Sequence, residues 1–128
     1  MRLLLDTHTA IWWINGHERL SSKAKAMLKD YANERYVSIV SAWEIAIKIS
    51  RGKLPEFMGG SKAFLMRLTD IQVTLLPILP RHLEILETLP FFHRDPFDRL
   101  LVATAKADGM TLLTADENIH KYGVRCVW

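Results

Sequence analysis

The segment DPFDRLLVATAKADGMTLLTAD, residues 95–116, contains a helix, a strand and acidic residues at both ends of the pair. Asp95 before Pro96 is a typical helix start, because the Asp side chain accepts hydrogen bonds from free backbone amides and proline suits the first helical turn. Gly109 ends the predicted helix, and the apolar residues 110–113 follow as a short strand. The segment therefore predicts one helix–strand unit of an α/β sheet.

The same alternation extends along the rest of the chain. Short runs, most of them apolar on both faces, predict strands at residues 3–5, 36–40, 73–76, 110–113 and 124–128. Capping signals and composition predict helices at residues 23–31, 42–50, 61–70, 80–89, 96–109 and 115–122. Strands that alternate with helices predict a parallel sheet with right-handed crossovers. The predicted fold class is α/β, a three-layer α/β/α sandwich around a central, mostly parallel sheet of about five strands.

Length and composition narrow the possible classes of protein. The 128 residues fit a single domain over 1–128, and 49% hydrophobic against 24% charged residues argues against disorder. The single cysteine, Cys126, excludes an internal disulfide framework, and the net charge of +3 is compatible with a polyanionic partner. The first apolar run ends at Asp6, too short for a signal peptide or a membrane helix. We therefore expect a cytoplasmic protein that makes no membrane contact.

Acidic residues from distant parts of the sequence map to one edge of the predicted sheet. Asp6 directly follows the first strand, and Asp116 lies just beyond the fourth. Glu44 and Asp98 lie in the first turns of predicted helices. In a parallel α/β sheet, the carboxyl ends of the strands lie at the same edge as the amino ends of the connecting helices, and ligands bind at that edge. The sequence thus predicts that Asp6, Glu44, Asp98 and Asp116 converge.

Several of these acids also have a structural interpretation. Ser41 and Glu44 have the spacing of a capping box, and Glu44 can pair with Lys48 one helical turn later. Asp95 can act as a helix cap alone, and Asp116 can cap the last short helix. Taken singly, Glu44, Asp95 and Asp116 favour these structural roles.

Asp6 and Asp98 fit a structural role less well. Asp6 lies between two apolar segments, where an acid is costly to bury unless it is paired or bound to a metal. The helix dipole favours Asp98, but the side chain is turned about 100° from Arg99, which with Lys106 marks the predicted solvent side. Converging carboxylates require a proton or a cation, and oxygen ligands suit Mg²⁺ or Mn²⁺.

Basic residues, histidines and the cysteine complete the polar groups of the sequence. Basic residues expected near the same edge, and able to hold a polyanion, are Lys48, Arg51, Lys53, His93, Arg94 and Arg99. The histidines show no metal-ligand spacing, so none is predicted as a ligand. Cys126 is interpreted as a small apolar residue of the last strand.

The stretches Leu3–Thr7, Ser41–Lys48, Asp95–Ala103 and Leu112–Asp116 occur in an order and spacing that resembles the PIN-domain family, in particular the VapC-like toxins of toxin–antitoxin pairs. The resemblance spans nearly the whole chain. It implies a PIN-like fold and an endoribonuclease that depends on Mg²⁺ or Mn²⁺. It also implies a cognate antitoxin protein that holds the enzyme inactive, and a homodimer.

The resemblance carries catalytic and metal-binding roles to Asp6, Glu44, Asp98 and Asp116, which fall on the acidic quartet of the family. It implies that Asp6 and Asp98 bind the metal most directly. Glu44 and Asp116 would complete the ligand shell, partly through water, or help to activate that water. Whether Asp95 adds a ligand or only caps its helix stays open at this point.

The resemblance also aligns Thr7 and Thr114 with small polar residues that form hydrogen bonds beside such a site. A helical surface with Trp12, Trp13 or Phe57 could serve a dimer, and the alternative is that these aromatic residues belong to the core.

Two other functions compete with a nuclease acting on RNA. One is a phosphotransferase with Asp6 as nucleophile, although His8 stands where related phosphatases have a second Asp and the chain contains no glycine-rich phosphate loop. The other is a non-catalytic α/β module that binds RNA or a protein partner.

Overall fold

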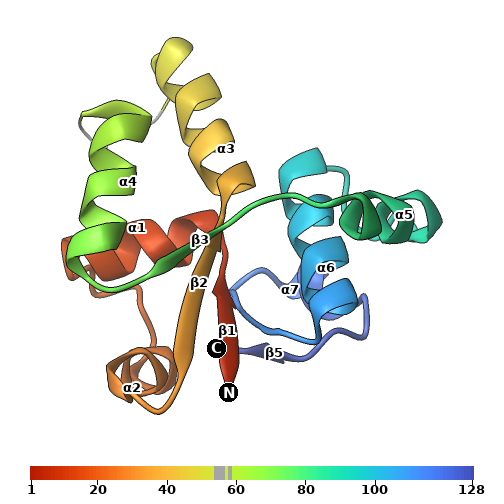
Figure 1. Ribbon diagram of the computed structural model, residues 1–128, viewed down its shortest axis with the longest axis horizontal. Coiled ribbons are helices and arrows are strands. Elements are labelled where there is room, and N and C mark those ends of the chain that lie inside the picture. The colour runs from red at the N-terminus through yellow and green to blue at the C-terminus, as the bar shows by residue number, and fades with distance from the viewer. Residues whose placement is uncertain (54–56, 58) are drawn as a thin grey trace.

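The protein folds around one parallel sheet (Figure 1). The structure is a computed structural model that describes residues 1–53, 57 and 59–128. The strands lie in the order β3-β2-β1-β4-β5, and every paired neighbour is parallel. Their bounds are β1 Arg2–Leu5, β2 Glu34–Ser38, β3 Thr74–Leu76, β4 Thr111–Leu113 and β5 Cys126–Val127. The predicted parallel α/β sheet is confirmed.

Helices cover both faces of the sheet. Figure 1 shows α1, α2 and α4 to the left of β1, and α5, α6 and α7 to its right. Their bounds, with α3, are α1 Thr7–Asn15, α2 Ser22–Lys29, α3 Ile39–Ser50, α4 Gly60–Asp70, α5 Pro80–Thr88, α6 Pro96–Asp108 and α7 Glu117–His120. This arrangement confirms the three layers predicted from the sequence.

The central strand shows why helices are needed on both sides. Successive side chains of a strand point to opposite faces. Leu3 and Leu5 of β1 pack into the apolar cluster that α1 to α4 build, whereas Leu4 packs into the cluster beneath α6 and α7. All three leucines are fully buried. Phe57 is also buried and meets Phe64 edge-on, so it belongs to the core and not to a dimer surface.

The start of α3 differs from the prediction. The helix begins at Ile39, and the hydroxyl of Ser38 caps it by accepting a hydrogen bond from the Val40 amide. Ser41, the predicted cap, is therefore inside the helix. Glu44 consequently lies in the second turn, and the capping box proposed for it is excluded.

In the described part of the chain, no helix combines the length and the apolar character needed to cross a bilayer.

Candidate active site

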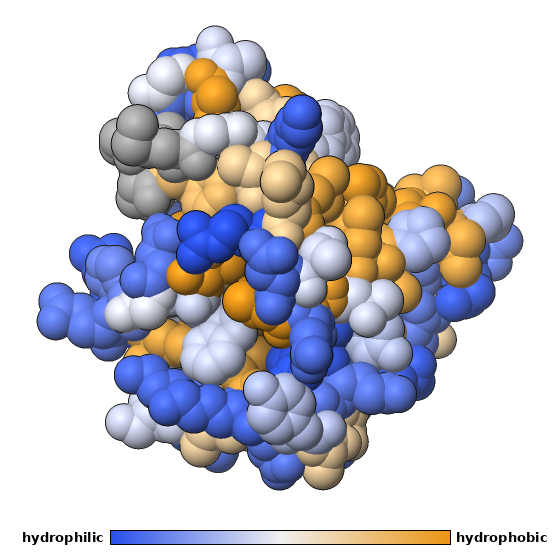
Figure 2. All heavy atoms as spheres, turned by 60° about the vertical axis from the view of Figure 1, so that its left-hand side comes forward, coloured by the Kyte–Doolittle hydropathy of each residue, from blue (hydrophilic) through white to orange (hydrophobic). Residues whose placement is uncertain are grey.

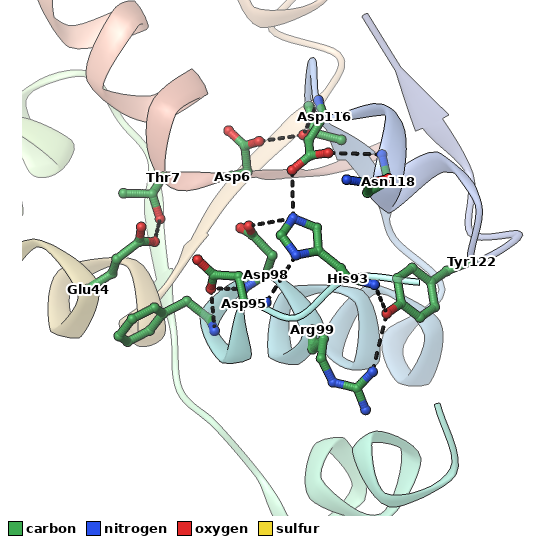
Figure 3. Close-up of polar contacts among 12 residues, drawn as sticks. Asp6, Thr7, Glu44, His93, Asp95, Asp98, Arg99, Asp116, Asn118 and Tyr122 are labelled. Carbon is green, nitrogen blue, oxygen red and sulfur yellow. Dashed lines mark hydrogen bonds and ion pairs between the residues drawn. The ribbon is translucent and has the colours of Figure 1, made fainter. Parts of the chain in front are cut away.

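Asp6 lies between the end of β1 and the start of α1, at the carboxyl edge of the sheet (Figure 3). One carboxylate oxygen accepts a hydrogen bond from the Thr9 amide at 2.8 Å, so Asp6 is the N-cap of α1. The other oxygen accepts a hydrogen bond from the hydroxyl of Thr114. Burial raises the pKa of the Asp6 carboxyl above its usual value, although both hydrogen bonds oppose this shift. Asp6 is thus a rigidly held acid from which water is largely excluded.

The first turn of α6 brings two more acids to the same place. Asp95 caps this helix, since one of its oxygens accepts hydrogen bonds from the amides of Phe97 and Asp98 at 2.8 and 3.1 Å. Asp98 then projects toward Asp6 (Figure 3). Burial, together with the negative charges of Asp95, Asp6 and Glu44, raises the pKa of Asp98 to about 7. Burial is the largest cause of this shift, and the smaller contributions of the three charges place these acids close enough to repel Asp98.

His93 lies between Asp98 and Asp116, at the edge where the sequence predicts a basic residue, but its contact with the two carboxylates was not predicted. Its Nε2 is 2.8 Å from a carboxylate oxygen of Asp116 and 3.2 Å from one of Asp98. Its Nδ1 accepts a hydrogen bond from the Asp95 amide at 3.0 Å, which assigns the ring proton to Nε2. His93 therefore donates to the carboxylates in this arrangement and has no lone pair at Nε2 to offer a metal.

Hydrogen bonds from Arg99 hold the segment that carries His93 in place. The Arg99 guanidinium donates to the Pro90 carbonyl at 2.7 Å and contacts the Tyr122 hydroxyl at 3.2 Å. That hydroxyl in turn accepts a hydrogen bond from the His93 amide at 2.9 Å. Arg99 is 7% exposed and lies over the ring of Phe91. The prediction that Arg99 faces solvent is therefore wrong, and its role is structural.

Glu44 reaches the site from α3 and differs from the other acids. One of its oxygens accepts a hydrogen bond from the Thr7 hydroxyl at 2.7 Å, and the other pairs with Lys48 at 2.6 Å. The predicted pairing with Lys48 is thus confirmed. Partial burial opposes protonation of Lys48, but the hydrogen bond to Glu44 and the nearby Asp95 and Asp98 raise its pKa. Lys48 is consequently a permanent cation on the Glu44 side of the site.

A cavity of 340 Å³ opens at the centre of these residues, and Asp6, Asp98 and Asp116 line it. Glu44 lies beside them without lining the cavity, and its carboxylate points toward Thr7 (Figure 3). Asp116 also caps α7 through the Asn118 amide at 2.9 Å, so its predicted role as a helix cap is confirmed. The predicted convergence of the acids is therefore found in the structure.

The donor set fits a hard divalent cation. Carboxylates from Asp6, Asp98 and Asp116 share one cavity, and their mutual repulsion favours a cation among them. In the described part of the chain, His93, Asp98 and Asp116 also form a group whose ligand atoms lie within 4.8 Å of one another. Because the proton of His93 occupies Nε2, the carboxylate oxygens are the atoms of this group that could hold a cation, and His93 is placed to orient them.

The Cys126 thiol plays no part in this chemistry. Burial and the charge of Asp6 raise its pKa to about 11, so the unreactive thiol form persists. Its half-buried place in β5 against the core fits the interpretation as a small apolar residue.

The fold and the site together define a parallel α/β protein with a cluster of acids at the carboxyl edge of its sheet. The family model of the PIN domain matches residues 3–124. The chain is also 31% identical to ribonuclease VapC22 of Mycobacterium tuberculosis over 121 residues, which are 94% of this chain and 91% of the relative. The chain therefore belongs to the PIN domain family.

Solved structures share the fold at lower sequence identity. A VapBC2 complex from Rickettsia felis, bound to a DNA fragment from its promoter, has a TM-score of 0.71 at 14% identity, covering 99% of this chain and 98% of that one. A DNA-bound VapBC from Salmonella typhimurium has a TM-score of 0.67 at 13% identity, covering 99% and 97%. At these identities the likeness establishes the fold alone.

Proposed function

We propose that the protein is an endoribonuclease that hydrolyses RNA phosphodiester bonds with the help of Mg²⁺ or Mn²⁺. The observation that carries this proposal is the shared cavity of Asp6, Asp98 and Asp116, in which burial and, to a smaller extent, the neighbouring acids raise the pKa of Asp98 to about 7. A site of this kind is stabilised by a divalent cation. The 31% identical relative, named a ribonuclease, supports RNA as the substrate.

Asp6, Asp98 and Asp116 are the residues that would hold the cation in this proposal. A bound divalent cation lowers the pKa of a water molecule and neutralises charge on the phosphate and the leaving oxygen. The chain positions its acids before any ligand arrives, because Thr9 and Thr114 fix both oxygens of Asp6. Such preorganisation removes the cost of ordering these groups during the reaction.

Glu44 and His93 would support the acids that line the cavity. Thr7 and Lys48 hold the Glu44 carboxylate at the flank, where it would complete the ligand shell through water. The Nε2 proton of His93 orients Asp116 and Asp98. Asp95, whose oxygen is occupied by two amides of α6, is assigned to the cap.

The same proposal includes protein partners. A solved toxin–antitoxin complex from Klebsiella pneumoniae shares the fold with a TM-score of 0.64 at 18% identity, which supports a cognate antitoxin as inhibitor and a toxin role for this chain. Apolar surface gathers on the right of the face shown in Figure 2 (orange). Exposed large apolar side chains include Ile39, Leu75 and Leu83, and exposed apolar patches of this kind mark protein contacts. A homodimer and an antitoxin complex both require such surface.

The test is cleavage of total RNA by the purified protein in Mg²⁺, in Mn²⁺ and in chelator. We expect cleavage only with a metal ion, and we expect Asp6→Asn to abolish it, because Asn retains the cap of α1 but loses the charge. The matched control is Asp70→Asn, which removes an exposed acid at the end of α4. Calorimetric titration with Mg²⁺ gives a second readout, which is expected to show weakened binding for Asp6→Asn alone.

Cleavage that persists in chelator would contradict the metal-dependent mechanism. RNA binding without cleavage under any of these conditions would favour the non-catalytic module instead. Growth arrest on expression, relieved by co-expression of a cognate antitoxin, is the expected result for the toxin role.

A further inference from the structure

The cavity that contains the acids continues along one face of α1. Besides the acids, its lining includes His8, Trp12 and Arg19. A second cavity, of 330 Å³, shares these three residues. The two cavities therefore adjoin and extend the acidic centre into a longer groove.

The second cavity adds His17 to its lining. We call the set His8, Trp12, His17 and Arg19 the α1 groove. None of these residues belongs to the proposed metal site, so the groove is a separate part of the surface beside it.

Three of the four residues of the α1 groove, His8, Trp12 and His17, carry aromatic rings. The Trp12 ring lies 5.7 Å from His8 and 6.1 Å from His17, and its plane is within 28° of that of His17. Trp128, the last residue of the chain, supports Trp12 from another side at 5.7 Å. Trp12 is partly exposed, and both histidines are exposed. Flat rings that are held in place and open to solvent are suited to stack on nucleobases.

Arg19 supplies the positive charge of the α1 groove. Its side chain lines both cavities, and its backbone amide donates to Nδ1 of His17 at 3.0 Å, which fixes that ring. Within residues 1–53, 57 and 59–128, the guanidinium forms no ion pair, even though Asp98 and Asp116 line the same cavity. The planar guanidinium matches the geometry of a phosphate.

We propose that the α1 groove is a nucleotide-binding subsite, in which a base stacks on Trp12 and His17 while Arg19 binds an adjoining phosphate. A single strand held in this way would pass into the acidic centre through the shared cavity. Rings interleaved with a cation match the alternating bases and phosphates of a single strand. The volume of the shared cavity, 340 Å³, lies in the range of small-ligand sites, about 300–1,000 Å³. The inference rests on the proposed function and assigns positioning roles.

The test measures RNA binding in the absence of cleavage. Fluorescence anisotropy of a labelled single-stranded RNA of about eight nucleotides in chelator, a length within the range that single-strand sites occupy, gives the dissociation constant for each variant. We expect Arg19→Ala to weaken binding about tenfold and to reduce the slope of log affinity against log salt by about 0.7. We expect Trp12→Leu to weaken binding about tenfold with an unchanged slope, because stacking involves no counterion release.

Two further variants make the result specific. Arg125→Ala removes an exposed arginine that lines a separate cavity beside Gly109, and we expect it to change affinity less than about twofold, as for a charge remote from the bound strand. His17→Ala alters an exposed ring, so it tests stacking without disturbing the packing of Trp12 against Trp128. We expect it to weaken binding in the same direction as Trp12→Leu.

The subsite is refuted if Arg19→Ala and His17→Ala bind RNA like the wild type, or if Arg125→Ala weakens binding equally. It is also refuted if these variants lose affinity for the antitoxin but not for RNA, since the groove would then bind a protein segment. The proposed nuclease is tested separately, by cleavage in Mg²⁺. A protein that cleaves RNA while ignoring Arg19 and His17 refutes only the subsite.

Discussion

The two ends of α6 carry similar groups but differ in charge balance. At the C-terminal end, Asp108 accepts hydrogen bonds from Arg81 at 2.6 Å and from His82 Nε2 at 2.9 Å. At the N-terminal end, a single nitrogen, His93 Nε2, contacts the carboxylates of both Asp98 and Asp116, at 3.2 and 2.8 Å. The two histidines are arranged alike, because Nδ1 of each accepts a backbone amide, from Leu79 in one case and from Asp95 in the other.

The pKa values record the difference between the two ends. The hydrogen bond from Arg81, supported by His82, lowers the pKa of Asp108 below its usual value. Burial and neighbouring acids raise the pKa of Asp98 to about 7. The negative charge at the C-terminal end is thus balanced by Arg81 and His82, whereas a cation would stabilise the unbalanced acids at the N-terminal end. An excess of acid over base at a cavity is typical of functional sites, which supports the proposed role of the N-terminal end.

The largest expected effect of a single substitution is at the acidic end. Asp98→Asn keeps the shape of the side chain but removes its charge, and we expect RNA cleavage to fall by about a thousandfold or more. The same change relieves repulsion, so we expect a higher melting temperature than the wild type in chelator. Cleavage assays and thermal unfolding of one preparation check both. An active Asp98→Asn, or one less stable than the wild type, would contradict the charge imbalance inferred here.

The matched histidines give the second comparison. We expect His93→Ala to reduce cleavage about 10–100-fold, the usual effect of losing a group that orients metal ligands. His82 is fully buried, so we expect His82→Ala to lower the free energy of unfolding by about 2 kcal/mol. Its cleavage rate should stay near that of the wild type at a temperature where both are folded. Urea unfolding and cleavage rates measure the two effects. Equal loss of activity in both variants would remove the distinction between the two ends.

Much of the framework could be predicted from the sequence, because buried strands and helix caps have strong local signals. The strands and the caps Asp95 and Asp116 are examples. The start of α3 was misplaced because Ile39 and Val40 are β-branched and extended the apparent strand. Their helical conformation depends on the cap at Ser38.

The site could be predicted only in its acids. The positions of Asp6, Asp98 and Asp116 could be predicted because strand carboxyl ends and helix amino ends share one edge of a parallel sheet. The cavity that the three acids line agrees with this prediction. His93 and Arg99 were expected near this edge as cations for a polyanion, but their contacts do not follow from the sequence, since Asp116 and Tyr122 come from a later part of the chain. The burial of Arg99 arises from the segment around Pro90, which packs over it. The sequence contains one signal that could have placed His93 at the site, because His93 precedes the predicted helix cap Asp95 by only two residues.

The smallest expected effect is the pH dependence of stability, whose sign should differ between the two ends. Asp108 has a lowered pKa, so its stabilisation is present above pH 4 and is lost as the pH falls through the folded value. Asp98 has a pKa raised to about 7, so the fold loses stability as the pH rises from about 4 to 7. Urea unfolding in chelator across this range checks both signs. The advantage of Asp98→Asn over the wild type should grow toward pH 7, whereas the deficit of Asp108→Asn should shrink only in acid below pH 4. If the free energy of unfolding relative to the wild type changed with pH in the same way for both variants, the two ends of α6 would carry the same charge balance.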